Sequence, residues 1–308
     1  MSEFETKLKI AIQKTDGRMG QDSTALLSAA NFSFQIGGRV DICEVEDFPL
    51  SIELVRIGDI PNDVERGYAD FGIVGQNSLA EAESAVIPLM PLGFGKCRLQ
   101  LGVKKDVPYE KPSDLNGLTV ATSYPNLSRD FFAKSNTNVD LLVRSGSIEK
   151  YVKSGEAQAC VDISSSGDSM RANGITAYDV LLESEAMLVA SPKLREKRGS
   201  ERFVKEFLMG IESALRVRNF TYIVMNAPES ARQTITDLLP SGESPTMSPL
   251  NESGWWAISS LIPRRNFRMI ISELQEAGAK DILELSPKQI IPNRNDRAII
   301  DLMEKIYG

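Results

Sequence analysis

The sequence of 308 residues contains no histidine. Histidine is the side chain that most often acts as a general base near neutral pH, and it is the commonest zinc ligand. Its absence excludes Ser-His-Asp and Cys-His nucleophile systems. Any chemistry here must therefore use carboxylates, lysine, arginine, backbone amides or a metal held by oxygen.

Cysteines and long apolar runs are also scarce. The three cysteines (Cys43, Cys97 and Cys160) are far apart and form no CxxC pair, which indicates reduced thiols in a cytoplasmic protein. No stretch approaches the roughly 18 apolar residues that a membrane span requires. The first apolar run, residues 8–12, is too short for a signal peptide. We therefore expect a cytoplasmic protein with no membrane partner.

The charge balance is acidic, with a formal net charge of -7 and a pI of about 5.0. An acidic surface repels a phosphate backbone, so we expect no nucleic-acid partner, although a local basic pocket for a small polyphosphate is compatible with this balance. Hydrophobic residues at 42% and charged residues at 25% are ordinary for a globular protein. The length allows two or three domains.

Short apolar runs alternate with helical patterns through the first two-thirds of the chain, which is typical of α/β layering. Residues 75–77 are expected to turn out of the strand before them, and residues 200–219 show apolar residues at helical spacing. The predicted strands are residues 8–13, 51–57, 70–74, 93–103, 119–122, 139–143, 159–163, 180–183 and 186–190.

From residue 222 onward the pattern becomes a β-α-β-β-α-β series, the order of a ferredoxin-like domain. Its predicted strands are residues 222–226, 246–250, 255–262 and 282–285, and its helices are residues 228–239 and 266–277. Residues 293–308 predict one further helix. We place the domain boundary near Asn226.

The stretch 159–170 carries the strongest functional signal. An apolar strand ends at Asp162, and a run of serines with Gly167 then opens a helix. Small residues and free amides at a strand-to-helix turn bind phosphate. Asp162 can hold ribose hydroxyls or, through water, a magnesium ion. A serine-rich turn with a solvated aspartate is an equally good interpretation of this stretch alone.

Three other segments are weaker candidates. Asp70 and Gly72 lie in a strand whose glycines suit a ligand crevice, although such glycines more often serve packing. Lys14 and Arg18 follow the first strand, and by themselves favour an exposed loop. Tyr124 ends another strand, where a simple proline turn is the alternative.

Taken in order, these segments resemble the ATP phosphoribosyltransferase family along essentially the whole chain. The resemblance is carried by Gly17-Arg18, by Arg56 with residues 59–61, by residues 94–99 and 121–125, by Glu149, Gly155, Asp162, Ser166, Gly167 and Met170, and in the last third by residues 243–246, 262–265 and 278–283. It implies the long form of the family. That form has two periplasmic-binding-protein-like α/β lobes (residues 1–99 with 188–225, and residues 100–187) and a ferredoxin-like regulatory domain with a C-terminal helix (residues 226–308).

The resemblance also implies an activity: joining ATP to 5-phosphoribosyl 1-pyrophosphate (PRPP) to open histidine biosynthesis, with Mg2+ as cofactor. It implies histidine as feedback inhibitor, dimers that assemble into hexamers, and no synthetase-like partner subunit. The implied site residues are, for catalysis, Asp162 and Glu149; for PRPP, Asp162, Ser164, Ser165, Ser166, Gly167, Asp168 and Ser169; for ATP, Lys14, Arg18, Asp70, Gly72 and Tyr124; for histidine, Asn226, Ser244, Thr246 and Ala279; and for magnesium, Asp162.

Two departures from the family pattern matter. Gln158 stands where the family usually has aspartate, and we expect this change to weaken ribose or magnesium binding. Asn226 stands where the regulatory site often has aspartate, which would weaken histidine binding. A two-lobe ligand-binding protein that has lost catalysis and a purely regulatory subunit are therefore the competing hypotheses.

Overall fold

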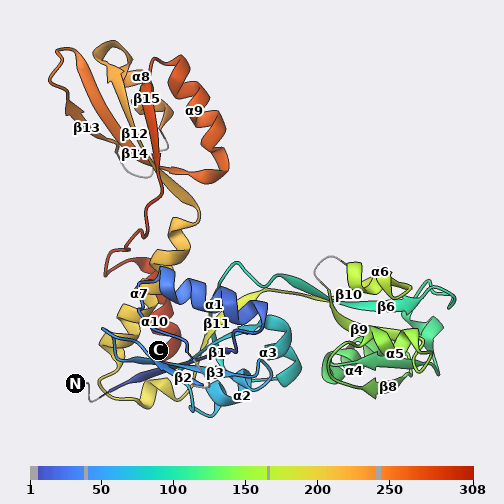
Figure 1. The fold of residues 1–308 in the computed structure, drawn as a ribbon. Coiled ribbons are helices and arrows are strands. Elements are labelled where there is room, and N and C mark those ends of the chain that lie inside the picture. Colours follow the sequence, from blue (N-terminus) through green and yellow to red (C-terminus); the bar gives the residue numbers. More distant parts are fainter. Residues whose placement is uncertain (1–5, 38–40, 165–166, 240–243) are drawn as a thin grey trace. The chain divides into compact units, whose positions relative to one another are not determined.

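The structure is a computed structural model that describes residues 6–37, 41–164, 167–239 and 244–308. The chain forms two compact units. The first holds the described residues up to 25, residues 33–204 and residues 301–308, and the second holds residues 26–32 and 205–300. Sheets A and B belong to the first unit and sheet C to the second (Figure 1).

Sheet A has the strand order β2-β3-β1-β4-β11-β5. β1 is parallel to β3 and β4, while β2 and β11 are antiparallel to their neighbours. Helix α2 packs against β1, β4 and β11. The elements are β1 (Leu8–Gln13), α1 (Arg18–Ala29), β2 (Ile42–Glu44), β3 (Leu50–Val55), α2 (Ile60–Glu65), β4 (Phe71–Gly75), α3 (Gln76–Ala82), β5 (Ile87–Pro91), β11 (Ala186–Ala190), the 3-10 turn Leu194–Glu196 and α7 (Glu201–Val217).

Sheet B has the order β10-β6-β9-β7-β8. β7 is parallel to β8 and β9, and β6 is antiparallel to β9 and β10. Its core contains Leu99, Leu101, Val161 and Phe132. The elements are β6 (Cys97–Lys104), the 3-10 turn Pro112–Leu115, β7 (Thr119–Thr122), α4 (Pro125–Lys134), β8 (Asp140–Val143), α5 (Glu149–Lys153), β9 (Ala159–Ser164), α6 (Asp168–Ala172) and β10 (Ile175–Ser184).

The chain passes from sheet A to sheet B between β5 and β6 and returns between β10 and β11 (Figure 1). We call sheet A with α1, α2 and α3 lobe I, and sheet B with α4, α5 and α6 lobe II. The two predicted α/β lobes are thereby confirmed, and the strands expected at residues 8–13, 119–122 and 186–190 have those bounds.

One local prediction is wrong in lobe I, and two of its strands were not predicted. Residues 75–77 were expected to turn away, but Gln76 begins helix α3 directly after β4. Strands β2 and β5 were not anticipated. β2 has three residues, and β5 carries prolines at both Pro88 and Pro91, which are tolerated because β5 is an edge strand.

Sheet C is fully antiparallel, with the order β13-β14-β12-β15. Alternate residues of β12, among them Ile223 and Met225, are buried against α8 and α9. This is the strand order and helix placement of the predicted ferredoxin-like domain. The elements are β12 (Phe220–Pro228), the 3-10 turn Glu229–Ala231, α8 (Arg232–Leu238), β13 (Thr246–Pro249), β14 (Trp255–Pro263), the 3-10 turn Arg264–Asn266, α9 (Phe267–Glu276), β15 (Lys280–Leu285) and, in the tail, α10 (Arg297–Tyr307).

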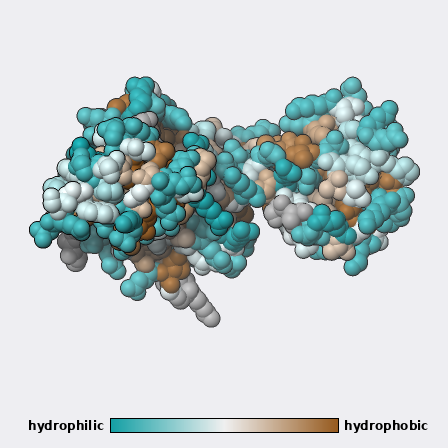
Figure 2. Space-filling view, turned by 90° about the horizontal axis from the view of Figure 1, so that it is seen from above, coloured by the Kyte–Doolittle hydropathy of each residue, from teal (hydrophilic) through white to brown (hydrophobic). Residues whose placement is uncertain are grey.

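On the face shown in Figure 2, hydrophilic residues predominate and apolar residues form small, separate groups. Within the described residues, no helix has the combined length and apolar character that a membrane crossing requires.

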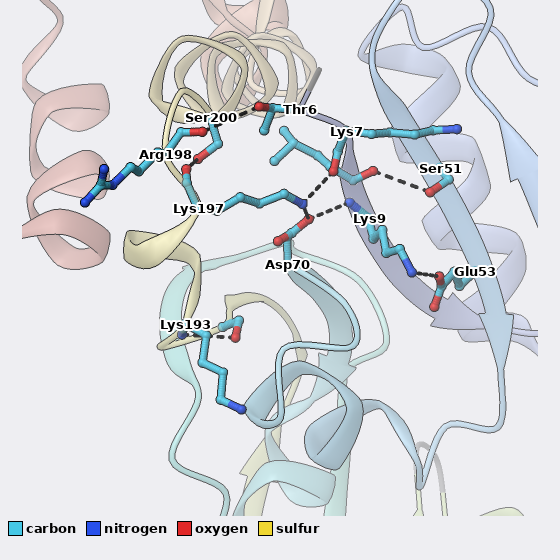
Figure 3. A network of polar contacts seen from close by, with 12 residues as sticks. Thr6, Lys7, Lys9, Ser51, Glu53, Asp70, Lys193, Lys197, Arg198 and Ser200 are labelled. Atoms are coloured by element: carbon cyan, nitrogen blue, oxygen red, sulfur yellow. Dashed lines mark hydrogen bonds and ion pairs between the residues drawn. The ribbon is translucent and has the colours of Figure 1, made fainter. Parts of the chain in front are cut away.

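Asp70 anchors the amino-terminal edge of sheet A (Figure 3). It directly precedes β4 and is 7% exposed. Its carboxylate accepts hydrogen bonds from the Lys9 amide at 2.8 Å and from Lys197 Nζ at 2.7 Å. Lys197 Nζ also donates to the Lys7 carbonyl. The network therefore joins β1, β4 and the segment that follows β11.

We expect Lys197→Met to lower the free energy of unfolding by about 2 kcal/mol, because it leaves a buried carboxylate without its cation. Lys193→Met is the matched control. Among the described residues, Lys193 Nζ donates to the Arg66 carbonyl alone, in an exposed contact, so its loss should cost less than about 0.5 kcal/mol. Urea unfolding of both variants measures the difference, and equal losses would contradict an anchoring role for Asp70.

Candidate functional site

The carboxyl ends of β7 and β9 bring most of the predicted sugar-phosphate residues together. The two strands are parallel neighbours, so Tyr124 after β7 and Asp162 near the end of β9 lie at the same edge of sheet B. Glu149 on α5 accepts a hydrogen bond from the Ser169 hydroxyl on α6 at this edge. Ligand crevices of α/β sheets form at such edges.

Asp162 is a buried carboxylate whose charge is only partly compensated. It is 8% exposed, and it accepts a hydrogen bond from the Ile163 amide at 2.8 Å. Burial raises its pKa to about 6, the nearby charge of Glu149 adds to this, and hydrogen bonds from Ile163, Ser123 and the Ile148 amide oppose it. A cation or a pair of hydroxyl donors beside Asp162 would therefore be stabilising.

The turn after β9 is built from small residues. The Ser164 hydroxyl accepts a hydrogen bond from the Gly167 amide at 2.7 Å. Gly167 has φ +75° at the start of α6, a conformation that favours glycine. Asp168 forms an ion pair with an arginine one turn later on α6. Ser165 and Ser166, the centre of the predicted phosphate turn, lie outside the described residues.

Tyr124 connects the two lobes. Its hydroxyl accepts a hydrogen bond from Asn77 Nδ2 of α3 at 2.7 Å, and Asn77 Oδ1 accepts one from the Ser184 hydroxyl at 2.9 Å. Burial raises the pKa of Tyr124 to about 12, and the charge of Asp162 contributes. The Tyr124 hydroxyl is therefore neutral at physiological pH. Nothing in the sequence indicated Asn77, because α3 was expected to be a turn.

A pocket of about 500 Å³ lies at the two crossovers between the lobes. It contains cations and carboxylates, and Arg98 pairs with Glu183 at 3.1 Å. Such a mixed lining suits a ligand with both phosphate and amine groups. Ser184 belongs both to this lining and to the hydrogen bonds around Tyr124. The lining residues are Gln76, Lys96, Cys97, Arg98, Glu183, Ser184 and Glu185.

The start of helix α1 contacts the first crossover. A Cβ on Gly95, which has φ +64°, would lie 2.7 Å from the Met19 methyl group, so the two segments are in close contact. Lys14 Nζ pairs with Asp41 at 2.7 Å, and the side chain of Arg18 is 88% exposed. The structure therefore brings the start of α1, which carries Arg18 and follows the loop with Lys14, up to the crossover segment.

Asp70 and Gly72 are not part of this arrangement. Asp70 directly precedes β4, so it lies at the edge of sheet A opposite to the one where β4 ends. Its carboxylate is paired with Lys197. A Cβ on Gly72 would lie 2.8 Å from the side chains of Ile60 and Val64, so this glycine lets α2 approach the sheet. In the structure these two residues serve anchoring and packing, and their nucleotide contacts stay a prediction.

The four residues assigned to histidine binding form two pairs, each in or just before a strand of sheet C. Ser244 and Thr246 line a pocket of about 420 Å³, together with residues that include Tyr222 and Ser259. Asn226 pairs with Lys280 across β12 and β15, next to the buried Ala279. Within the described residues, Asn226 and Ala279 do not line that pocket.

A sequence model of the family described as ATP phosphoribosyltransferase matches residues 56–213, and a second, described as HisG, C-terminal domain, matches residues 218–287. The chain belongs to the ATP phosphoribosyltransferase family. As a member of this family, it joins ATP to PRPP in the first step of histidine biosynthesis. The resemblance stated from the sequence is confirmed.

Named relatives align over almost the whole chain. The ATP phosphoribosyltransferase of Cytophaga hutchinsonii is 37% identical over 288 residues, covering 94% of this chain and 100% of its own. That of Phocaeicola vulgatus is 34% identical over 284 residues, covering 92% and 99%. The ATP phosphoribosyl transferase (HisG:HisZ) complex from Thermotoga maritima aligns with a TM-score of 0.58 at 24% identity, covering 67% of this chain and 98% of that one, which shows a shared fold.

Gln158, the departure from the ATP phosphoribosyltransferase pattern, lies away from the acidic edge. It precedes β9, and its side-chain oxygen accepts a hydrogen bond from the Thr119 amide at 3.1 Å. Asp162 follows four residues later, roughly 13 Å further along an extended strand. Gln158 therefore holds the start of β7 to the start of β9. The expectation that it weakens ribose or magnesium binding has no geometric support.

We expect Gln158→Asp to change kcat and KM by less than about twofold, because a carboxylate oxygen can also accept the Thr119 amide hydrogen. Steady-state kinetics with ATP and PRPP checks this. A gain in kcat of about tenfold or more would instead mean that Gln158 limits catalysis in this ATP phosphoribosyltransferase.

Proposed function

We propose that PRPP binds at the carboxyl edge of sheet B, with its ribose hydroxyls on Asp162. The supporting observation is that Asp162 is buried beside a second carboxylate, Glu149, without enough donors to offset its charge. Ribose hydroxyls supply such donors. The turn comprising Ser164, Ser165, Ser166, Gly167, Asp168 and Ser169 holds the 5-phosphate through amides and hydroxyls.

We assign ATP to the pocket at the crossovers. Lys96 and Arg98 from its lining, with Arg18 at the start of α1 and Lys14 in the loop before it, provide cations for the triphosphate. Tyr124 stands between this pocket and Asp162, so the adenine ring approaches the ribose beside Tyr124. Asp70 and Gly72 are left out of this assignment because both serve the packing of lobe I.

In this arrangement, adenine N1 attacks C1 of the phosphoribosyl group as pyrophosphate departs. The breaking C1–O bond leaves positive charge on the ribose. In this proposal the carboxylates of Asp162 and Glu149 stabilise that charge. Little proton transfer is required, which agrees with a chain that has no histidine. Catalysis then depends mainly on how the two lobes position the substrates.

The acidic edge fits a magnesium ion that is held largely by the substrate. Within the described residues, no group of three or more histidine, cysteine or acidic side chains could enclose a metal. Magnesium commonly uses one or two carboxylates, waters and substrate phosphates, and Asp162 with Glu149 matches that need. When bound, the ion neutralises charge on the departing pyrophosphate.

We assign regulation to sheet C and its helices. The assignment is residues 1–99 with 188–225 for lobe I, residues 100–187 for lobe II, and residues 226–308 for a regulatory domain with its C-terminal helix. Histidine binds through Ser244 and Thr246 of the sheet C pocket and through Asn226 and Ala279 beside it. The protein acts in the cytoplasm as dimers that assemble into hexamers, without a synthetase-like partner subunit.

Asp162→Asn tests the sugar-phosphate site with two readouts of opposite sign. The rate of phosphoribosyl-ATP formation, as kcat/KM for PRPP, should fall about 100-fold or more, because the amide stabilises positive charge poorly. The free energy of unfolding without ligand or metal should rise by on the order of 1–3 kcal/mol at pH 8. A raised folded-state pKa means that the wild-type carboxyl group stabilises the fold fully below about pH 4 and loses this contribution as pH rises through about 6.

The stability gain of Asp162→Asn should therefore vanish near pH 4. Asp106→Asn is the control, since Asp106 is an exposed acid in lobe II that pairs with Lys104. Unchanged kcat/KM in Asp162→Asn would show that PRPP binds elsewhere.

The regulatory assignment is tested in the same assay. Added histidine should lower turnover, and Thr246→Val should raise the histidine concentration for half-inhibition about tenfold, because it removes a hydroxyl from the pocket. The kcat without histidine should stay unchanged. Equal inhibition of Thr246→Val and the unmodified protein would place the histidine site elsewhere.

A further inference from the structure

Helix α3 of lobe I presents two polar side chains to the turn between β7 and α4 in lobe II. Asn77 and Glu81 are four residues apart, so they lie on one face of the helix. Among the described residues, the side-chain hydrogen bonds of Glu81 and of Asn77 are all to lobe II. Neither residue belongs to the substrate groups assigned above.

Glu81 caps helix α4 from the opposite lobe. Tyr124 occupies the N-cap position of α4 and makes no side-chain cap. The Glu81 carboxylate instead accepts hydrogen bonds from the Asn126 amide at 2.9 Å and the Leu127 amide at 3.1 Å. The Asn126 side chain donates to the Glu81 carbonyl at 2.9 Å. These amides are the donors that an N-cap serine or aspartate ordinarily satisfies, so α4 depends on lobe I for its cap.

Asn77 is hydrogen-bonded to two separate segments of lobe II, Tyr124 after β7 and Ser184 at the end of β10. Asn77 is 6% exposed. Its side-chain Nδ2 donates to the Tyr124 hydroxyl at 2.7 Å, and its backbone amide donates to Ser184 Oγ at 3.0 Å. Ser184 is 5% exposed and donates back to Asn77 Oδ1. Breaking this contact would leave buried polar atoms without partners, which is costly. The contact therefore favours one arrangement of α3 against the β7–α4 turn.

The turn held in this way also supports Asp162. The Tyr124 amide donates to Thr122 Oγ1 at 2.8 Å, and Thr122 Oγ1 donates to the Val161 carbonyl at 2.9 Å, one residue before Asp162. Ser123 hydrogen-bonds the Asp162 carboxylate. A displacement of α3 would thus reach the acidic edge through a continuous set of hydrogen bonds.

We propose that Asn77 and Glu81 are positioning residues that clasp α3 to the β7–α4 turn and hold the two substrates in register for the transfer. The proposal rests on the assignment of PRPP to the Asp162 edge and of ATP to the crossover pocket. Each substrate keeps its own contacts when the clasp is broken, but adenine N1 and C1 no longer meet in line. The clasp therefore acts on kcat and has little effect on KM.

Glu81→Gln and Asn77→Ala test the clasp. We expect kcat to fall about 10- to 100-fold while each KM changes less than about threefold, because small misplacements of reacting atoms are costly. Asn77→Asp should recover kcat to within about threefold, since a carboxylate accepts hydrogen bonds from both Tyr124 and Ser184. Glu65→Gln is the matched control: the Glu65 carboxylate accepts from Ser84 Oγ at 2.9 Å and the Ala85 amide at 3.3 Å, entirely within lobe I. Its kcat should stay within about twofold.

Calorimetric titration with PRPP distinguishes failure of the clasp proposal from failure of the PRPP assignment on which it rests. Glu81→Gln should bind PRPP normally, whereas Asp162→Asn should not. If Asp162→Asn binds PRPP normally, the substrate assignment fails, whatever the clasp variants show. If folded Glu81→Gln and Asn77→Ala keep kcat within about twofold, or if they raise KM and leave kcat unchanged, the clasp proposal is overturned.

Discussion

Asp162 and Glu149 are buried near each other at the carboxyl edge of sheet B, and this placement is unfavourable by itself. Two like charges in a low-dielectric setting require donors, and the surrounding elements supply some of them. Ser169 donates to Glu149, and the Ile163 amide donates to Asp162. These donors do not fully offset the two negative charges. A ligand that brings hydroxyl groups or a cation would therefore be stabilised at this edge.

The reaction joins two substrates, and the fold has two lobes joined by two crossovers. A displacement that demands little proton transfer suits a chain without histidine. The main contribution of the protein is then to position the substrates. Contacts far from the reacting atoms can therefore affect the rate of the reaction. The hydrogen bonds of α3 to the β7–α4 turn are contacts of this kind, because they join segments from both lobes.

Much of the fold could be predicted because its strands are short, apolar and separated by clear turn signals. β1 and β7 have the predicted bounds, and the β-α-β-β-α-β series gave the strand order of sheet C. The edge strand β5, with two prolines, and helix α3, which begins directly after a glycine, carry no such signal. Neighbouring strands, and not local sequence preference, decide their conformation.

The sequence by itself determined the chemistry that is available: no histidine, a serine-rich turn after Asp162, and an order of segments shared with one enzyme family. Only the tertiary structure decided which of these residues share an edge. Asp70 and Gly72 have the residue types of a ligand crevice, yet the direction of β4 and the approach of α2 turn them to anchoring and packing. Gln158 and Asp162 belong to the same stretch of the family signature, but the extended chain between them holds them roughly 13 Å apart, because each residue of a strand advances about 3.3 Å.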